Sequence, residues 1–263
     1  MYETNYHKAK SLQDAAALLS QADDGAVLAG GQTLIPTLKQ RLAAPSDLVD
    51  LADAGLAGIE EASGTLEIGA MTTHAEVAAS EKVQKVIPGL ACLAAGIGDP
   101  AVRHRGTIGG SLANNDPAAD YPAAMLALAA TIVTDQREIA AEDFFTGMFS
   151  TDLEEGEIIK SIRVSAPERG AYAKFPNPAS RYAMAGVFVA KTASGVRVAV
   201  TGAGEDGVYR DAGIEAALTA DFAPSAIDGL DVAADGMMSD IHGSAVYRAQ
   251  LVKVMAKRAT EAA

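Results

Sequence analysis

Cysteine is almost absent from this sequence, since its 263 residues include only one, Cys92. A single cysteine excludes a disulfide within the chain, and it cannot by itself hold a zinc ion or an iron–sulfur cluster. The residues around it are apolar, so we expect Cys92 to be a small buried hydrophobic residue. The four histidines show no metal-binding spacing, and the sequence therefore predicts no metal site.

Positive charge and long apolar runs are also in short supply. The chain has 21 Lys and Arg against 34 Asp and Glu, a net charge of −13. Because such a chain repels phosphate backbones and anionic lipid surfaces, we expect neither nucleic acid nor a membrane as its partner. The N-terminal residues lack an apolar signal core, and the apolar run at 123–133 is too short to span a bilayer. These absences favour a cytoplasmic protein.

The elements that the sequence does predict change in character along the chain. A β-α-β-like opening lobe comes first, then more strands and helices, and from about residue 170 strands alternate with glycine-containing turns. The chain is long for a single core, so we predict an α+β protein of two domains. The expected elements are helix 11–21 capped by Ser11, strand 25–31, helix 33–42, strand 47–51, strand 64–70, a helix capped by Thr72 or Thr73, helix 84–97, helix and strand 122–134, strand 156–164, an antiparallel sheet over 170–204, and helices 211–220 and 243–263.

The first candidate ligand-binding feature is the segment Ala-Gly-Gly-Gln-Thr, residues 29–33, between a strand and a helix. Two glycines allow a sharp turn and bring backbone N–H groups close to an anion, and the following helix adds the positive end of its dipole. This arrangement suits a diphosphate. Taken alone, the segment is better explained as an ordinary glycine turn, because it matches no established nucleotide-binding motif.

The second feature is Thr-Ile-Gly-Gly-Ser, residues 107–111, which offers the same physics again. Gly109 and Gly110 tolerate positive φ, hydroxyl groups flank them, and the carboxylate of Asp120 can accept protons from a sugar. A polar surface loop explains a single such segment equally well. Two glycine loops followed by an acid favour a ligand with a diphosphate and two sugar-like arms.

Other residues carry weaker signals. The basic patch Arg103–Arg105 either faces a phosphate or balances nearby acids, and the sequence favours neither reading. Tyr182 either stacks on a flat ring or packs in a core, and composition favours packing. The nucleophile motif Gly-x-Ser-x-Gly is absent and spacing alone assembles no catalytic triad, so we predict no catalytic residue on this chain.

Three segments, in their order and separations, closely resemble the FAD-binding medium subunit of the molybdenum hydroxylases, the xanthine dehydrogenase and aerobic carbon monoxide dehydrogenase family. They are AGGQTLIPTLKQRL, IGDPAVRHRGTIGGSLANNDPAADYPAAMLAL and YRAQLVKVMAKRA. The resemblance implies a two-lobed FAD-binding domain of the vanillyl-alcohol-oxidase (PCMH) type over residues 1–168, with lobes of about 1–55 and 56–168. A carbon-monoxide-dehydrogenase-flavoprotein-like domain with a small antiparallel sheet and helices would follow over 169–263.

The resemblance also implies the FAD-binding residues. The two glycine loops would cradle the diphosphate, and Asp120 matches the acid that contacts the sugar portion of the cofactor. Gln32 and Thr33 stand where close relatives often have His and Ser, so side-chain contacts there differ while backbone contacts are kept. The implied set is Ala29, Gly30, Gly31, Gln32, Thr33, Leu34, Thr107, Ile108, Gly109, Gly110, Ser111 and Asp120, with Ile97 near the cofactor, Ile159 near the flavin ring and Tyr182 over that ring.

The role implied by the resemblance is the electron exit of a larger enzyme. Electrons would leave a molybdenum cofactor on a large subunit, cross two [2Fe-2S] clusters on a small subunit, and reach FAD here before passing to an external acceptor. The single cysteine agrees, because the clusters must then lie on a partner. Two alternatives are a stand-alone FAD-dependent oxidoreductase with its own substrate, for which the chain is short, and a flavin-free assembly module, which would not need both glycine pairs.

Overall fold

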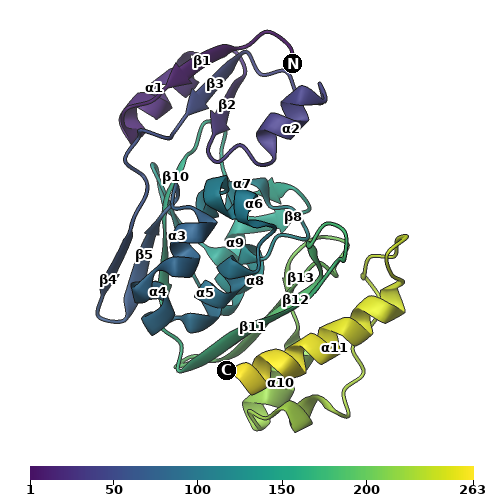
Figure 1. Cartoon of the computed structure of the whole chain (residues 1–263). Helices are drawn as coiled ribbons and strands as arrows, with labels where there is room; N and C mark the ends of the chain where they lie inside the picture. The colour runs from purple at the N-terminus through teal and green to yellow at the C-terminus, as the bar shows by residue number, and fades with distance from the viewer.

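The computed structural model describes residues 1–263, which form three regions that follow one another down the molecule in Figure 1. The first is a parallel sheet in the order β1-β3-β2 with two helices. Ser11 caps α1 as predicted, since its hydroxyl accepts the Asp14 N–H at 3.1 Å, and α1 buries Ala15 and Leu19. The elements are β1 (Asn5–Lys8), α1 (Leu12–Gln21), β2 (Gly25–Leu28), α2 (Leu34–Lys39) and β3 (Asp47–Asp50).

The middle region combines a five-stranded antiparallel sheet, in the order β4-β5-β10-β6-β7, with a group of short helices. Of the two threonines that could cap α3, Thr73 does so, through a reciprocal capping box with Glu76. The elements are β4 (Ile59–Ala62), β5 (Thr65–Gly69), α3 (His74–Ala79), α4 (Glu81–Val86), α5 (Pro88–Ala95), α6 (Pro100–Arg105), α7 (Ile108–Asn114), α8 (Tyr121–Ala127), β6 (Thr131–Thr134), β7 (Glu138–Ala140), α9 (Ala141–Phe144), β8 (Phe145–Gly147), β9 (Ser150–Thr151) and β10 (Ile159–Ser165).

Two predictions for this region are wrong. The expected helix 84–97 is two helices, because Ile87 leaves the helical conformation (φ −141°, ψ 73°) immediately before Pro88. Cys92 is exposed rather than buried. Cys92 lies on α5, a helix that is apolar on all sides. The adjacent residues Ala91 and Leu93 are buried instead.

The C-terminal region is the predicted antiparallel sheet, in the order β11-β12-β13-β14, covered on one face by α10 and α11 (Figure 1). Strand β12 is buried along most of its length, because it pairs with β11 on one side and β13 on the other. The elements are β11 (Arg169–Pro176), β12 (Ala183–Thr192), β13 (Gly195–Thr201), β14 (Tyr209–Arg210), α10 (Ala212–Ala220), the 3₁₀ helix η1 (Pro224–Ile227) and α11 (Ala245–Ala262).

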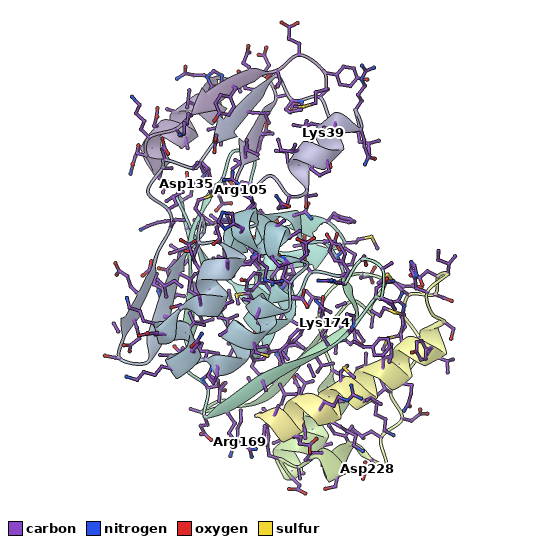
Figure 2. The ribbon with its side chains drawn as sticks, viewed as in Figure 1. Lys39, Arg105, Asp135, Arg169, Lys174 and Asp228 are labelled. Atoms are coloured by element: carbon purple, nitrogen blue, oxygen red, sulfur yellow. The ribbon has the colours of Figure 1, made fainter.

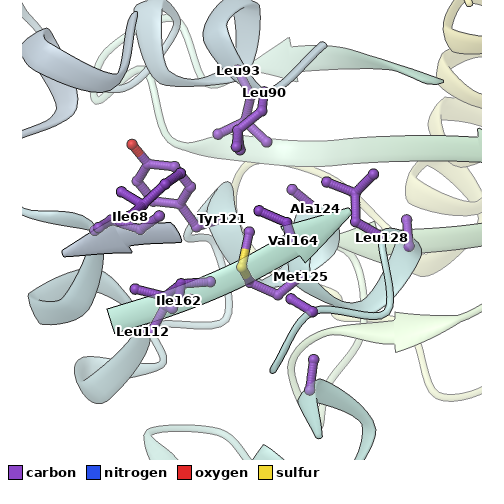
Figure 3. Packing of buried hydrophobic residues seen from close by; sticks show 14 of the residues in the cluster. Ile68, Leu90, Leu93, Leu112, Tyr121, Ala124, Met125, Leu128, Ile162 and Val164 are labelled. Carbon is purple, nitrogen blue, oxygen red and sulfur yellow. The ribbon is translucent and has the colours of Figure 1, made fainter. Parts of the chain in front are cut away.

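Each region has a hydrophobic cluster of its own, and the clusters also join the regions. Figure 3 shows part of the largest, where Tyr121 and Met125 of α8 pack with Leu112 of α7 and Ile162 of β10. Phe188 of β12 belongs to the same cluster, so the C-terminal sheet closes over the middle helices. The chain is therefore an α+β protein, as predicted, with its regions held against one another. Its longest helices are too short or too polar to cross a lipid bilayer.

Candidate functional site

A cleft of about 730 Å³ lies where the three regions meet. This volume falls within the range of about 300–1,000 Å³ that is usual for small-molecule sites. Fourteen of the fifteen residues proposed from the sequence line it, and the exception is Ile108, whose side chain is fully buried in the largest hydrophobic cluster. The fourteen are Ala29, Gly30, Gly31, Gln32, Thr33, Leu34, Ile97, Thr107, Gly109, Gly110, Ser111, Asp120, Ile159 and Tyr182.

The first glycine loop lines this cleft and contains a continuous run of unpaired amides. The backbone N–H groups of residues 29–34 donate to no acceptor within the chain, although each of these residues lines the cleft. Gly31 adopts a left-handed φ of +70°, which a residue with a side chain rarely takes up. Successive free N–H groups form a concave site for an anion, so this loop can hold a phosphate group without any charged side chain.

Gly30 serves a second purpose, which is contact between the lobes. A Cβ atom at Gly30 would lie 2.1 Å from the Arg105 carbonyl oxygen and 2.8 Å from Gly106 Cα. The first loop therefore rests directly on the backbone of the middle region, near the position of Arg105 in Figure 2. Only glycine permits this close approach. Gly30 and Gly31 therefore serve both the run of unpaired amides and the contact between the lobes.

The second glycine pair differs from its prediction. Gly109 and Gly110 lie in the first turn of α7 with ordinary helical φ, not in a loop with positive φ. The N–H groups of this segment all donate to acceptors within the chain at 2.9–3.1 Å. The pairs are Ile108 to Thr72 O, Gly109 to Ala70 O, Gly110 to Thr107 Oγ1 and Ser111 to Thr107 O. The prediction of a second free-amide cradle is therefore wrong, and this wall of the cleft offers hydroxyl groups and a bare glycine surface instead.

Asp120 is held in place by two partners that the sequence did not reveal. It is 5% exposed, accepts a hydrogen bond from the Tyr172 hydroxyl at 2.5 Å, and pairs with Lys174 at 3.0 Å. Burial raises the pKa of Asp120, whereas Lys174 and Tyr172 oppose that effect. Burial also raises the pKa of Tyr172, so the phenol stays protonated and donates. Figure 2 shows Lys174 near the centre of the molecule, between the middle helices and the C-terminal sheet.

Tyr182 is half exposed and lines the cleft, so the prediction that it packs in a core is wrong. It ends a tight turn in which Asn177 N–H donates to Tyr182 O at 2.7 Å and Arg181 N–H donates to Asn177 O at 2.8 Å. Arg181 takes a left-handed φ of +65°. The turn therefore presents a flat aromatic ring to the cleft from the C-terminal region.

The basic patch does not line the cleft with its charges. Arg103 donates through Nη1 to Ile97 O at 3.0 Å and to Gly98 O at 3.3 Å, which fixes the turn that carries Ile97 into the cleft wall. His104 and Arg105 are exposed and lie outside the cleft lining. Of the two readings left open by the sequence, neither describes Arg103, because its partners are backbone carbonyl groups.

His74 is a cleft residue that was not predicted from the sequence. It is the first residue of α3, lines the cleft, and is 5% exposed. Burial lowers its pKa to about 4, with a smaller contribution from the charge of Arg103. The imidazole is therefore neutral near pH 7. Because one histidine in a polar segment carries no pattern, only the folded chain reveals its place in the cleft wall.

Comparison with known proteins adds to this geometry. Residues 2–167 match a family described as the FAD binding domain in molybdopterin dehydrogenase. The chain is 37% identical to the carbon monoxide dehydrogenase medium chain of Hydrogenophaga pseudoflava, over 98% of this chain and 96% of that protein. It is 36% identical to the nicotine 6-hydroxylase medium subunit of Paenarthrobacter nicotinovorans, over 96% and 94% respectively. A crystal structure of the Cu,Mo-CO dehydrogenase matches with a TM-score of 0.91 at 34% identity, covering 100% of this chain and 98% of that one.

Proposed function

The chain belongs to the family of FAD-binding domains in molybdopterin dehydrogenases, and we propose that it is the electron-transfer subunit of a molybdenum hydroxylase complex. It is an FAD-binding subunit of a multi-subunit dehydrogenase. FAD supplies electron transfer between donors and acceptors when it is bound. In our proposal the electrons come from [2Fe-2S] clusters on a small partner subunit, after substrate oxidation on a molybdenum-cofactor large subunit, and they leave to an external acceptor.

The observation that carries this proposal is the run of unpaired amides at residues 29–34. A diphosphate is the anionic part of FAD, and six successive N–H groups on one cleft wall suit it without a cationic side chain. The second glycine segment contributes differently, with Thr107 and Ser111 hydroxyl groups and the bare surface of Gly109 and Gly110. The residues present therefore fit an elongated anionic cofactor.

The other lining residues take the remaining parts of the cofactor in this proposal. Asp120, fixed by Lys174, accepts hydroxyl protons of a sugar portion. Ile97 and Ile159 provide apolar walls, and Tyr182 covers the flavin ring. Ile108, which the resemblance included, has its side chain in the core, where it anchors α7. No side chain in the cleft is required as an acid or a base.

We also propose that the chain divides into an FAD-binding domain over 1–168, with lobes of about 1–55 and 56–168, and a C-terminal domain over 169–263. The start of β11 at Arg169 supports this boundary. The separate hydrophobic cluster beneath α10 and α11 supports it too. The C-terminal domain completes the cleft, because it supplies Tyr182 and the Lys174 that holds Asp120.

Purification of the complex from its native host tests the function. We expect flavin absorption superposed on iron–sulfur absorption, FAD released by acid, and molybdenum and iron in the same particle. Reduction of the flavin by substrate should require the partner subunits. A flavin-containing chain that purifies alone and oxidises its own substrate would instead establish a stand-alone oxidoreductase. A colourless chain that binds no added FAD, alone or with partners, would contradict the proposal.

A further inference from the structure

Two buried polar atoms beside the cleft have no hydrogen-bond partner within the chain. They are His74 Nδ1 and the Tyr121 hydroxyl, and the two rings lie 5.3 Å apart between centroids, tilted by 48°. Tyr121 is fully buried in the cluster of Figure 3, and His74 is 5% exposed in the cleft wall. Buried polar atoms without partners are rare in native proteins, so this pair of orphaned atoms calls for a function.

The protonation states of the two rings indicate how they fit together. Burial raises the pKa of Tyr121, so its hydroxyl keeps its proton and can donate. His74 is neutral near pH 7 and therefore has one N–H and one bare nitrogen. The Tyr121 ring is an aromatic neighbour of His74, and since its hydroxyl and Nδ1 both lack a partner within the chain, a hydrogen bond between them would satisfy both. Nδ1 is then the acceptor, and the imidazole proton belongs on Nε2.

Nε2 is the ring nitrogen that faces the cleft. It is not among the enclosed atoms without a partner, and His74 contributes to the cleft lining. Its position is close to the first glycine loop: a Cβ atom at Gly106 would lie 2.5 Å from Nε2, and a Cβ atom at Gly30 would lie 2.8 Å from Gly106 Cα. Nε2 therefore lies beside the Gly106 backbone, which also contacts the first glycine loop with its free amides.

We propose that His74 is an FAD-binding residue that donates its Nε2 hydrogen to a diphosphate oxygen, while Tyr121 fixes the tautomer by donating to Nδ1. This inference rests on the proposed function and adds to it a neutral side-chain donor beside the amide loop. It also explains both orphaned atoms, since one donates to the other and the cofactor completes the chain of hydrogen bonds.

Measurement of FAD affinity in variants of the full chain tests this role. His74→Asn keeps an amide near the Nδ1 position but loses the donor to the cleft, and we expect FAD to bind about 10- to 100-fold more weakly, the usual effect of removing a hydrogen bond to a charged group. His74→Gln places its amide nitrogen near the Nε2 position, and we expect affinity within roughly threefold of the native chain. His104→Asn, on the exposed neighbouring helix, is the matched control and should bind FAD as the native chain does.

The outcomes separate this inference from the function beneath it. A native chain that binds no FAD would overturn the proposed function. Normal FAD binding by the native chain and by a stably folded His74→Asn variant would overturn only the role of His74. Equal losses in the Asn and Gln variants would also overturn it, because a packing role does not distinguish an amide near Nε2 from one near Nδ1.

Nitrogen NMR of the histidine side chains reads the tautomer of His74 directly in the native full chain. The chain has four histidines, and the His74→Gln spectrum identifies the signals of His74. We expect a protonated Nε2 and a bare Nδ1, with the Nε2 signal moving when FAD is added. Tyr121→Phe should give a mixture of the two tautomers. A protonated Nδ1, or an Nε2 signal that FAD leaves unmoved, would refute the assignment.

Discussion

The two glycine pairs of this chain look alike in sequence and differ in what their backbones do. Around Gly30 and Gly31 the amides of six successive residues are unpaired, and all six residues line the cleft. Around Gly109 and Gly110 every amide from 108 to 111 already has an acceptor in the chain. The first pair is therefore suited to hold a ligand, and the second is suited to hold the protein together. A glycine pair indicates close approach, and its surroundings decide what approaches.

The threonines at the two helix starts differ as well. Thr107 is extended (φ −116°, ψ 153°), and its hydroxyl accepts the Gly110 N–H, so α7 begins already capped. Thr33 is helical (φ −106°, ψ −51°) and makes no capping bond, and in the first turn of α2 the Ile35 and Thr37 N–H groups donate to Gly31 O and Thr33 O while the Leu34 N–H stays free. A capped helix start satisfies its own donors, whereas an uncapped one must find other acceptors.

The largest test of this comparison is Gly109→Val. A Cβ atom at this position would lie 2.5 Å from Ala70 Cβ and 2.8 Å from Ala70 O, which is the acceptor of the Gly109 N–H. We expect a loss of about 3 kcal/mol or more in the free energy of unfolding, because α7 must move off the sheet. Urea unfolding without FAD measures it. The control is Gly229→Val, where no atom lies within 4 Å of the new Cβ and the backbone is not left-handed. If the Gly109→Val variant has native stability, the second glycine pair does not have the structural role assigned to it.

Acid should lower the free energy of unfolding through His74, which lies near the second glycine pair, without any mutation. His74 contacts Gly106, and its pKa falls from an unfolded value near 6.5 to about 4 on folding. The unfolded chain therefore binds more protons between these values, so stability is fully present above pH 6.5 and is lost as the pH falls through 4. We expect a loss of about 3 kcal/mol from this residue across that window. The difference in unfolding free energy between the native chain and His74→Gln, measured at each pH, isolates the contribution of His74. If the two pH curves are parallel, His74 does not titrate in this way.

The first pair is tested through the cofactor rather than through stability. Gly31→Ala strains a residue at φ +70° and brings a Cβ atom 2.9 Å from Ile35 Cγ1, so the amide run must shift. We expect FAD to bind roughly tenfold more weakly, which corresponds to about 1.4 kcal/mol. Gly55→Ala has nearly the same φ, +73°, with no atom within 4 Å of the new Cβ, and it lies outside the cleft. It should lose similar stability and no FAD affinity. Equal affinities in the two variants would argue against the amide run as the diphosphate site.

Local patterns allowed much of this fold to be predicted, because the interactions that form it are local. Strands alternating with glycine turns after residue 170 gave the antiparallel sheet, and Ser11 and Thr73 cap helices within their own turns. The first glycine loop was placed correctly between a strand and a helix for the same reason. The predicted burial of Cys92 is wrong because the sequence of a helix that is apolar on all sides does not indicate which side faces the core.

The contacts that hold the cleft together could not be predicted in this way. Lys174 is 54 residues from Asp120, and the two meet only because the C-terminal sheet packs on α8. The Ile108 and Gly109 N–H groups donate to Thr72 O and Ala70 O, on a neighbouring segment whose position depends on the completed sheet. A residue pattern specifies what a segment can do, whereas the tertiary structure determines which of its polar groups are still free.

The smallest test concerns the two threonines themselves. Thr107→Ala removes the hydroxyl that accepts the Gly110 N–H, and we expect the free energy of unfolding to fall by about 1 kcal/mol, the usual effect of losing a capping side chain. Thr33→Ala removes a side chain that makes no capping bond, so we expect a change within about 0.5 kcal/mol. Both variants are measured by urea unfolding in the absence of FAD. Equal losses would mean that the two helix starts do not differ in capping.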